Sequence, residues 1–209
     1  MSNFFLTTLR LFVLFGRNTV GCINKPYMTC RKLSDGKTDS RQTVFIFLLV
    51  IGYFAFASAI RVGLRNPFLL TVRFNSLLAS AIAGFLLTIL LLVFAGRLLG
   101  QKVSIKAVFT PWSFSLLPTI VWFLATSVLY ILLPPPRTLT VFGKAYSLLY
   151  LAFSIALLFW KLILYYLTLR FGLKIDMARI FLVSLVIFPS LIGYSLLMYK
   201  FGVFRIPFI

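Results

Sequence analysis

The sequence predicts an all-α, polytopic membrane protein with five transmembrane helices and an N-terminal amphipathic helix in the membrane interface. Three observations lead to this fold class. Hydrophobic side chains make up 61% of the 209 residues, charged side chains make up only 11%, and the mean hydropathy is +1.05. A soluble domain carries about 25% charged residues and has no core large enough to bury so much apolar surface. The apolar residues are also gathered in long uncharged runs.

The chain begins with a short apolar segment, residues 3–15, that contains Arg10. Asn3, Thr7, Arg10 and Arg17 recur at helical spacing and form a narrow polar stripe. This pattern is typical of a helix that lies in the interface. A signal peptide is the alternative, but a basic n-region and a small-residue cleavage site are missing. The expected apolar face comprises Phe4, Phe5, Leu9, Phe12 and Phe15.

Five apolar stretches then follow, each long enough to cross a hydrocarbon core of about 30 Å, which takes about 20 helical residues. Strands do not explain them, because strands usually stop at about ten residues and alternate in a barrel. The predicted spans comprise residues 43–60, 75–96, 108–133, 145–169 and 178–199. The chain therefore divides into a cytoplasmic N-terminal segment, residues 1–42, and a transmembrane domain, residues 43–209. Residues 24–42 are polar and predict a basic loop before the first span.

The basic residues predict the orientation of the chain. Thirteen lie in the N-terminal segment and in the loops after the second and fourth spans, and seven lie on the other side. Because cytoplasmic loops carry the excess of Lys and Arg, we expect the N-terminus in the cytoplasm and the C-terminus on the opposite side. The net charge of +18 indicates anionic phospholipid as a partner, not nucleic acid, since basic residues near a membrane surface contribute about 1 kcal/mol each. The residues expected to bind lipid are Arg10, Arg17, Arg31, Lys32 and Arg41.

The sequence lacks the residues on which much enzyme chemistry depends. It has no His and only three acidic residues, Asp35, Asp39 and Asp176, none of them inside a predicted span. This excludes HExxH zinc sites, Ser-His-Asp triads and carboxylate-lined proton pathways from this chain alone. Cys22 and Cys30 have neither CxxC nor metal-ligand spacing, so we expect reduced thiols, with acylation as an alternative. We therefore expect no enzyme, no catalytic residue, no cofactor and no metal.

Three residues inside the spans are candidates for a functional role. Lys161 is the one charge well inside a span, and an ionisable residue there is a functional hypothesis. Its alternatives are snorkelling toward Arg170, nine residues away, or a bond to another helix. Pro118 and Pro189 should kink or break the third and fifth spans, and broken helices line the binding sites of some transporters.

Small residues predict where helices approach each other. Ser76, Ser80 and Gly84 repeat every four positions in the second span, and Gly52 begins a similar series in the first. Such faces let backbones come close in lipid. Packing of the first two spans against each other is one interpretation, and the seam of a homo-oligomer is the other.

Two stretches resemble the Yip family of small membrane proteins, named for interaction with Ypt/Rab GTPases. Residues 96–118, GRLLGQKVSIKAVFTPWSFSLLP, resemble the family's basic loop leading into a proline-marked third span. Residues 157–189 resemble its Trp-bearing fourth span, short basic loop and the Ala at the start of its fifth span. The resemblance covers about residues 43–200. The DLYGP-type signature of eukaryotic members is absent, so the resemblance implies a bacterial-type, inner-membrane member and does not extend to a Rab-type GTPase as partner.

These features predict a non-catalytic scaffold or accessory subunit of a membrane complex, or a protein of membrane organisation. Its partners would be anionic phospholipid and other membrane protein subunits or further copies of itself. The alternative is a transporter or channel component that uses Lys161 and the kinked third and fifth spans. The lack of acidic residues inside the spans opposes this alternative, as does the lack of an inverted repeat.

Overall fold

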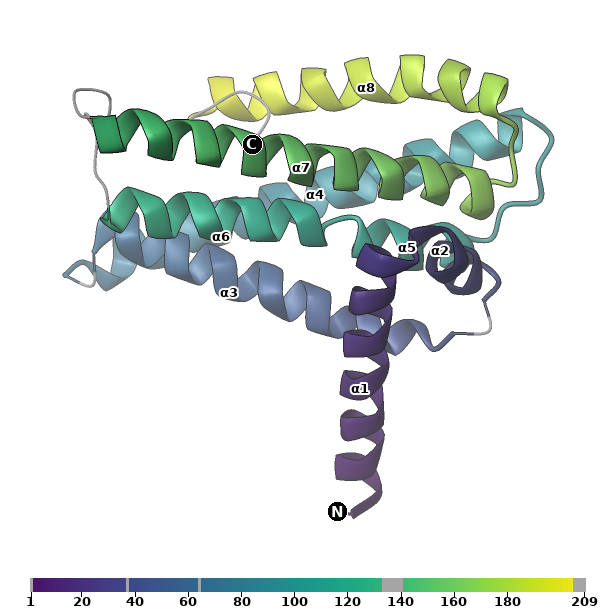
Figure 1. Ribbon diagram of the computed structural model, residues 1–209, viewed down its shortest axis with the longest axis horizontal. Helices are drawn as coiled ribbons and strands as arrows, with labels where there is room; N and C mark the ends of the chain where they lie inside the picture. Colours follow the sequence, from purple (N-terminus) through teal and green to yellow (C-terminus); the bar gives the residue numbers. More distant parts are fainter. Residues whose placement is uncertain (1, 37, 64, 133–140, 205–209) are drawn as a thin grey trace.

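Figure 1 shows the computed structural model of the chain, which describes residues 2–36, 38–63, 65–132 and 141–204. Within these ranges every regular element is helical. The elements are α1 (Ser2–Asn24), α2 (Pro26–Ser34), the 3-10 helix η1 (Ser40–Gln42), α3 (Thr43–Val62), α4 (Pro67–Leu98), α5 (Ile105–Phe114), α6 (Leu117–Leu132), α7 (Val141–Gly172) and α8 (Met177–Lys200).

Five helical segments of the described chain are long and apolar enough to cross a membrane. They are Ser40–Ile60, Pro67–Leu98, Ile105–Leu129, Gly143–Gly172 and Met177–Lys200. The predicted fold class, all-α with five spans, is confirmed at this level. The last residue of the predicted third span, residue 133, lies outside the described residues.

Two of the spans extend well beyond their predicted bounds. α4 and α7 have 32 residues each, and at 1.5 Å per residue each is about 48 Å long. The prediction started the second span at residue 75 because Arg73 was assigned to the preceding loop. α4 instead begins at Pro67, whose fixed φ and missing N–H suit the first turn of a helix. Arg73 therefore lies inside the second turn of α4.

The spanning helices lie alongside one another, and α1 crosses their direction and projects from the bundle (Figure 1). We call the end of the bundle that carries α2 the α2 end. It also holds the α4–α5 and α7–α8 connections, whereas the α3–α4 turn lies at the opposite end, here called the far end (Figure 1).

The buried core is concentrated at the α2 end and has two parts. One part joins α4, α5, α7 and α8, with Leu92 and Leu169 fully buried. The other part joins α1, α2, α3, α5, α6 and α7, with Cys30, Phe114 and Leu164 fully buried. The N-terminal helices thus share a core with the spans.

Candidate functional site

The region predicted as a loop, residues 24–42, contains α2 and η1, so this part of the prediction is wrong. Pro26 starts α2 at a position where its missing N–H has no partner in any helix. Cys30 and Leu33 are buried against α5 and α7. α2 has only nine residues, and its apolar positions are too few for a helical period to be recognised in the sequence.

α1 presents one face to the bundle and another to its surroundings. Phe15 is half-buried, with its ring 5.6 Å from that of Phe45 and 6.1 Å from that of Phe114. Phe15 was predicted on the exposed apolar face, and this is wrong because the residue lies on the docked side of the helix. The predicted Phe4 side chain lies outside the described residues. The exposed apolar side chains of α1 are Phe5, Leu6, Leu9, Phe12, Val13, Val20 and Ile23.

Buried polar contacts fix the second half of α1. The side-chain amide of Asn18 donates a hydrogen bond to Oε1 of Gln42 at 2.7 Å, and both residues are buried. The indole Nε1 of Trp160 in α7 donates to the backbone carbonyl of Cys22 at 3.1 Å. A buried hydrogen bond is costly to break because its two groups lose water without a replacement. α1 is therefore held in one direction relative to the bundle.

The five predicted lipid-binding residues are all exposed. Arg10 and Arg17 lie on α1, Arg31 and Lys32 on α2, and Arg41 on η1. All five thus belong to the N-terminal helices at or near the α2 end, where their charges are free to meet lipid phosphates.

Arg31 lines a polar cavity of about 290 Å³ between α2, the end of α7 and the α7–α8 connection. Its other cations are Arg170 and Lys174, and its two carboxylates are Asp35 and Asp176. Asp176 also occupies the N-cap position of α8 but makes no capping hydrogen bond. The cavity carries more positive than negative charge, so it suits the phosphate of a lipid headgroup.

Lys161 belongs to a polar seam between α6 and α7. Its Nζ donates to Oγ1 of Thr119 at 2.5 Å, which is a bond to another helix and not an extension toward Arg170. The seam continues from Nε1 of Trp122 to Oγ of Ser154 at 2.9 Å, and between the hydroxyls of Thr126 and Tyr150 at 2.5 Å. These partners were not predicted, although residues 119, 122 and 126 are spaced as one face of a helix. Lys161 lines neither of the two cavities described here.

Pro118 breaks the third span, as predicted. α5 ends at Phe114 and α6 begins at Leu117. Both Ser115 and Pro118 are buried, and the Oγ of Ser115 donates to the carbonyl of Trp112 at 2.7 Å. Irregular backbone at membrane depth is tolerated only where protein covers it or water fills a cavity. Here α1 and α2 cover the break, because Phe114 and Leu117 pack in the same cluster as Cys30.

The helix around Pro189 behaves differently. α8 runs without interruption from Met177 to Lys200 with Pro189 inside it. Of the two predicted outcomes at Pro189, a kink or a break, the break is therefore wrong, and the kink stays a prediction. A proline leaves the carbonyl four residues earlier without a donor, and α8 accommodates that loss within a continuous helix.

The predicted small-residue faces have different neighbours. A Cβ at Gly84 would lie 2.9 Å from Cε1 of Tyr194 in α8, and the Tyr194 hydroxyl donates to the carbonyl of Ser80 at 2.5 Å. Ser80 and Gly84 thus contact a tyrosine of the fifth span. The first two spans also pack against each other, for example through the rings of Phe47 and Phe85. Ser76 lines a cavity at the far end. Gly52 is exposed, and a Cβ there would meet nothing within 4 Å.

Cys22 and Cys30 are free, fully buried thiols next to each other. The hydrogen bond between Cys22 and Cys30 and the burial of the site raise the pKa of Cys22 well above its ordinary value of 9.0. The Cys22 thiol is thus kept neutral, and burial keeps both side chains out of reach of an acylating enzyme. No three His, Cys, Asp or Glu side chains come together as metal ligands in the part of the chain that the structure describes.

No family model, curated protein or solved structure matches this chain. The resemblance to the Yip family therefore depends on the two sequence stretches given above.

Proposed function

We propose that the chain is a non-catalytic integral membrane protein of Yip type, in the bacterial inner membrane. It acts as an accessory or scaffold subunit of a membrane complex, or in membrane organisation. One observation carries this proposal. α1 is fixed crosswise to the spans by buried contacts, while the rest of its surface exposes large apolar side chains (Figure 1).

The direction of α1 supports a position on the membrane surface. If the spans cross the bilayer, a helix crosswise to them runs along the interface. Phe5 and Leu9 are then free to enter the boundary between headgroups and acyl chains, with Arg10 and Arg17 beside lipid phosphates. Phe12 is also exposed, although its ring packs edge-on against Phe45. Because buried hydrogen bonds attach α1 to the bundle, α1 occupies area in one leaflet at a fixed place beside the spans. The positive-inside rule assigns that leaflet to the cytoplasmic side.

Spin labelling of the full chain in vesicles of phosphatidylcholine and phosphatidylglycerol tests the position of α1. Labels are placed at Leu9→Cys and Arg17→Cys, and the buried Cys22 and Cys30 stay unlabelled. We expect the label at residue 9 to be reached by oxygen, which concentrates in lipid, and the label at residue 17 by a water-soluble nickel chelate. Lys102→Cys, in the exposed α4–α5 connection, is the aqueous control. Equal access of the chelate to residues 9 and 102 contradicts the proposal.

Vesicle shape tests the organising function. Proteoliposomes with the wild-type chain should have a smaller mean diameter than those with the triple variant Phe5→Ser, Leu9→Ser, Phe12→Ser, because the variant loses the inserted apolar face. Leu98→Ser, a similarly exposed position at the end of α4, is the matched control. Equal diameters for the wild type and the triple variant contradict membrane shaping. Co-purification in mild detergent then tests the remaining scaffold role through stoichiometric membrane partners.

The transport alternative has its own test. Lys161 is bonded to Thr119, and the break at Pro118 is covered by apolar side chains, so neither forms a polar path in the described chain. We expect proteoliposomes to show no ion flux above that of protein-free vesicles. Flux that Lys161→Met abolishes would replace the scaffold proposal with a transport function.

A further inference from the structure

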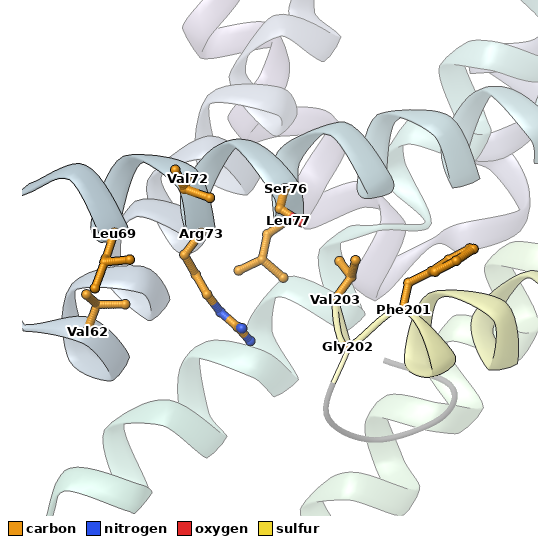
Figure 2. A pocket seen from close by; sticks show the side chains of 9 residues that line it. All are labelled: Val62, Leu69, Val72, Arg73, Ser76, Leu77, Phe201, Gly202 and Val203. Carbon is orange, nitrogen blue, oxygen red and sulfur yellow. The ribbon is translucent and has the colours of Figure 1, made fainter.

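A second cavity lies at the far end of the bundle, away from α1 and α2. It has a volume of about 320 Å³ and lies between the end of α3, the first turns of α4 and the residues that follow α8 (Figure 2). Most of its lining is apolar and comprises Val62, Leu69, Val72, Leu77, Phe201 and Val203. Among the described residues of the lining, Arg73 is the single charged one, and Ser76 adds a hydroxyl one turn further along α4.

The guanidinium of Arg73 has no counter-charge in the described chain. Its Nε and Nη2 atoms are buried and have no hydrogen-bond partner there, and Figure 2 shows the side chain extending from α4 among the lining residues. Arginine stays protonated, so a buried guanidinium without a partner is unfavourable. The three acidic side chains of the protein, Asp35, Asp39 and Asp176, all lie toward the α2 end. None of these three side chains therefore neutralises Arg73, and an anion from outside the described chain would supply the missing counter-charge.

We propose that this cavity binds an anionic phospholipid, with the phosphate on Arg73. A guanidinium can donate two parallel hydrogen bonds to a phosphate, and Arg73 lines the cavity. Arg73 lies six residues after the start of α4, about 9 Å along the helix, which places it near the depth of the headgroup and glycerol region. The phosphate lies beside Arg73 and Ser76, and the apolar lining receives the first part of the acyl chains. The acyl chains continue along the exposed side chains of Leu69 and Val72, which border the opening.

This site differs from the lipid contacts of the proposed function. It lies at the other end of the spans, so its lipid belongs to the opposite leaflet. Arg10, Arg17, Arg31, Lys32 and Arg41 take no part in it. Failure of either proposal leaves the other intact.

Lipid titration of the delipidated full chain in detergent tests the site, with the thermal unfolding temperature as readout, because a ligand of the folded state raises it with concentration. Phosphatidylglycerol should stabilise the wild type, and Arg73→Gln should weaken this binding about tenfold or more. Arg73→Lys should give an intermediate loss, since it keeps the charge without the paired donors. Arg65→Gln removes an exposed charge from the preceding turn and should bind like the wild type.

Two further arms decide the outcome. Palmitate tests whether a carboxylate replaces the phosphate, and stabilisation by palmitate alone would overturn the phospholipid assignment. Equal affinity of the wild type and Arg73→Gln for phosphatidylglycerol would overturn the site itself. If Arg73→Gln fails to fold, Ser76→Leu narrows the cavity while it keeps the charge, and unchanged lipid affinity in that variant likewise contradicts the proposal.

Discussion

The indole nitrogen of Trp160 in α7 donates a hydrogen bond to the backbone carbonyl of Cys22, 138 residues earlier in the chain, at 3.1 Å. In a continuous helix this carbonyl would accept from the N–H four residues later, and that residue is Pro26, which has none. Trp160 thus supplies the donor that the junction between α1 and α2 lacks. A single contact with the fourth span both satisfies this junction and fixes α1.

Loss of that donor should destabilise the protein. Trp160→Phe keeps an aromatic ring but leaves the Cys22 carbonyl without a partner, so we expect the free energy of unfolding to fall by about 1–3 kcal/mol. Pro26→Ala restores an N–H at the position four residues after Cys22. The double variant should therefore lose less stability than Trp160→Phe alone, as measured by unfolding in detergent. Additive effects of the two substitutions would show that the carbonyl has no need of a donor.

Two substitutions in the seam between α6 and α7 should change the free energy of unfolding by different amounts. Thr119→Val leaves the ammonium of Lys161 without its partner and should lower the free energy of unfolding by about 1–3 kcal/mol. Lys161→Met removes the charge and fills similar space, so it should be near neutral or stabilising. Unfolding of both variants in the same detergent tests this, and a larger loss for Lys161→Met would refute it.

Two glycines of the spans should respond in opposite directions to alanine. At Gly84 the added methyl would lie 2.9 Å from the ring of Tyr194, which is held by its bond to Ser80, so overpacking should cost about 1–3 kcal/mol. Gly52→Ala meets open space and gains helix propensity of about 1 kcal/mol. Thermal unfolding of the pair measures the difference. A Gly52 variant with lower stability or altered oligomeric state would indicate that its face contacts a second copy.

Measurement of the orientation of the chain in the membrane requires introduced cysteines. Cys22 and Cys30 are fully buried, so their failure to react with an impermeant reagent carries no information about sides. Asn66→Cys, in the exposed α3–α4 connection, should react from outside intact cells. Lys102→Cys, in the exposed α4–α5 connection, should react only after the membrane is opened. Labelling of both from the same side would mean that one span is assigned wrongly.

The buried thiol pair predicts a dependence of stability on pH. The pKa of Cys22 is raised in the folded state, and in the unfolded chain it lies near 9.0. Folding therefore favours the neutral thiol. This contribution is complete below pH 9 and falls by about 1.4 kcal/mol per pH unit as pH rises above 9. The stability difference between the wild type and Cys22→Ala, followed by thermal unfolding, should shrink from pH 8 to pH 10, and a constant difference would contradict it.

Sequence alone determined the membrane class and the five spans, and it marked Pro118 as a candidate break. Length and apolarity identify a span because no water is present in the bilayer to accept a charge or a free backbone group. The missing N–H of Pro118 leaves the Phe114 carbonyl without its helical donor, and α5 ends at that residue. Pro189 lies inside a continuous α8, so a proline alone does not decide whether a helix ends. The absence of His and the presence of only three acidic residues also limit the possible enzyme chemistry, and both can be read from the sequence without a structure.

Only the tertiary structure decided which residues meet. It joined Cys22 to Trp160, Lys161 to Thr119 and Gly84 to Tyr194, and it left Arg73 beside a cavity. In a soluble helix an apolar stripe marks the packed face, but a transmembrane helix is apolar on the sides that face lipid as well as on those that face protein. Hydropathy therefore reveals that a segment spans the membrane, and shape and hydrogen bonding between helices determine what each of its faces touches.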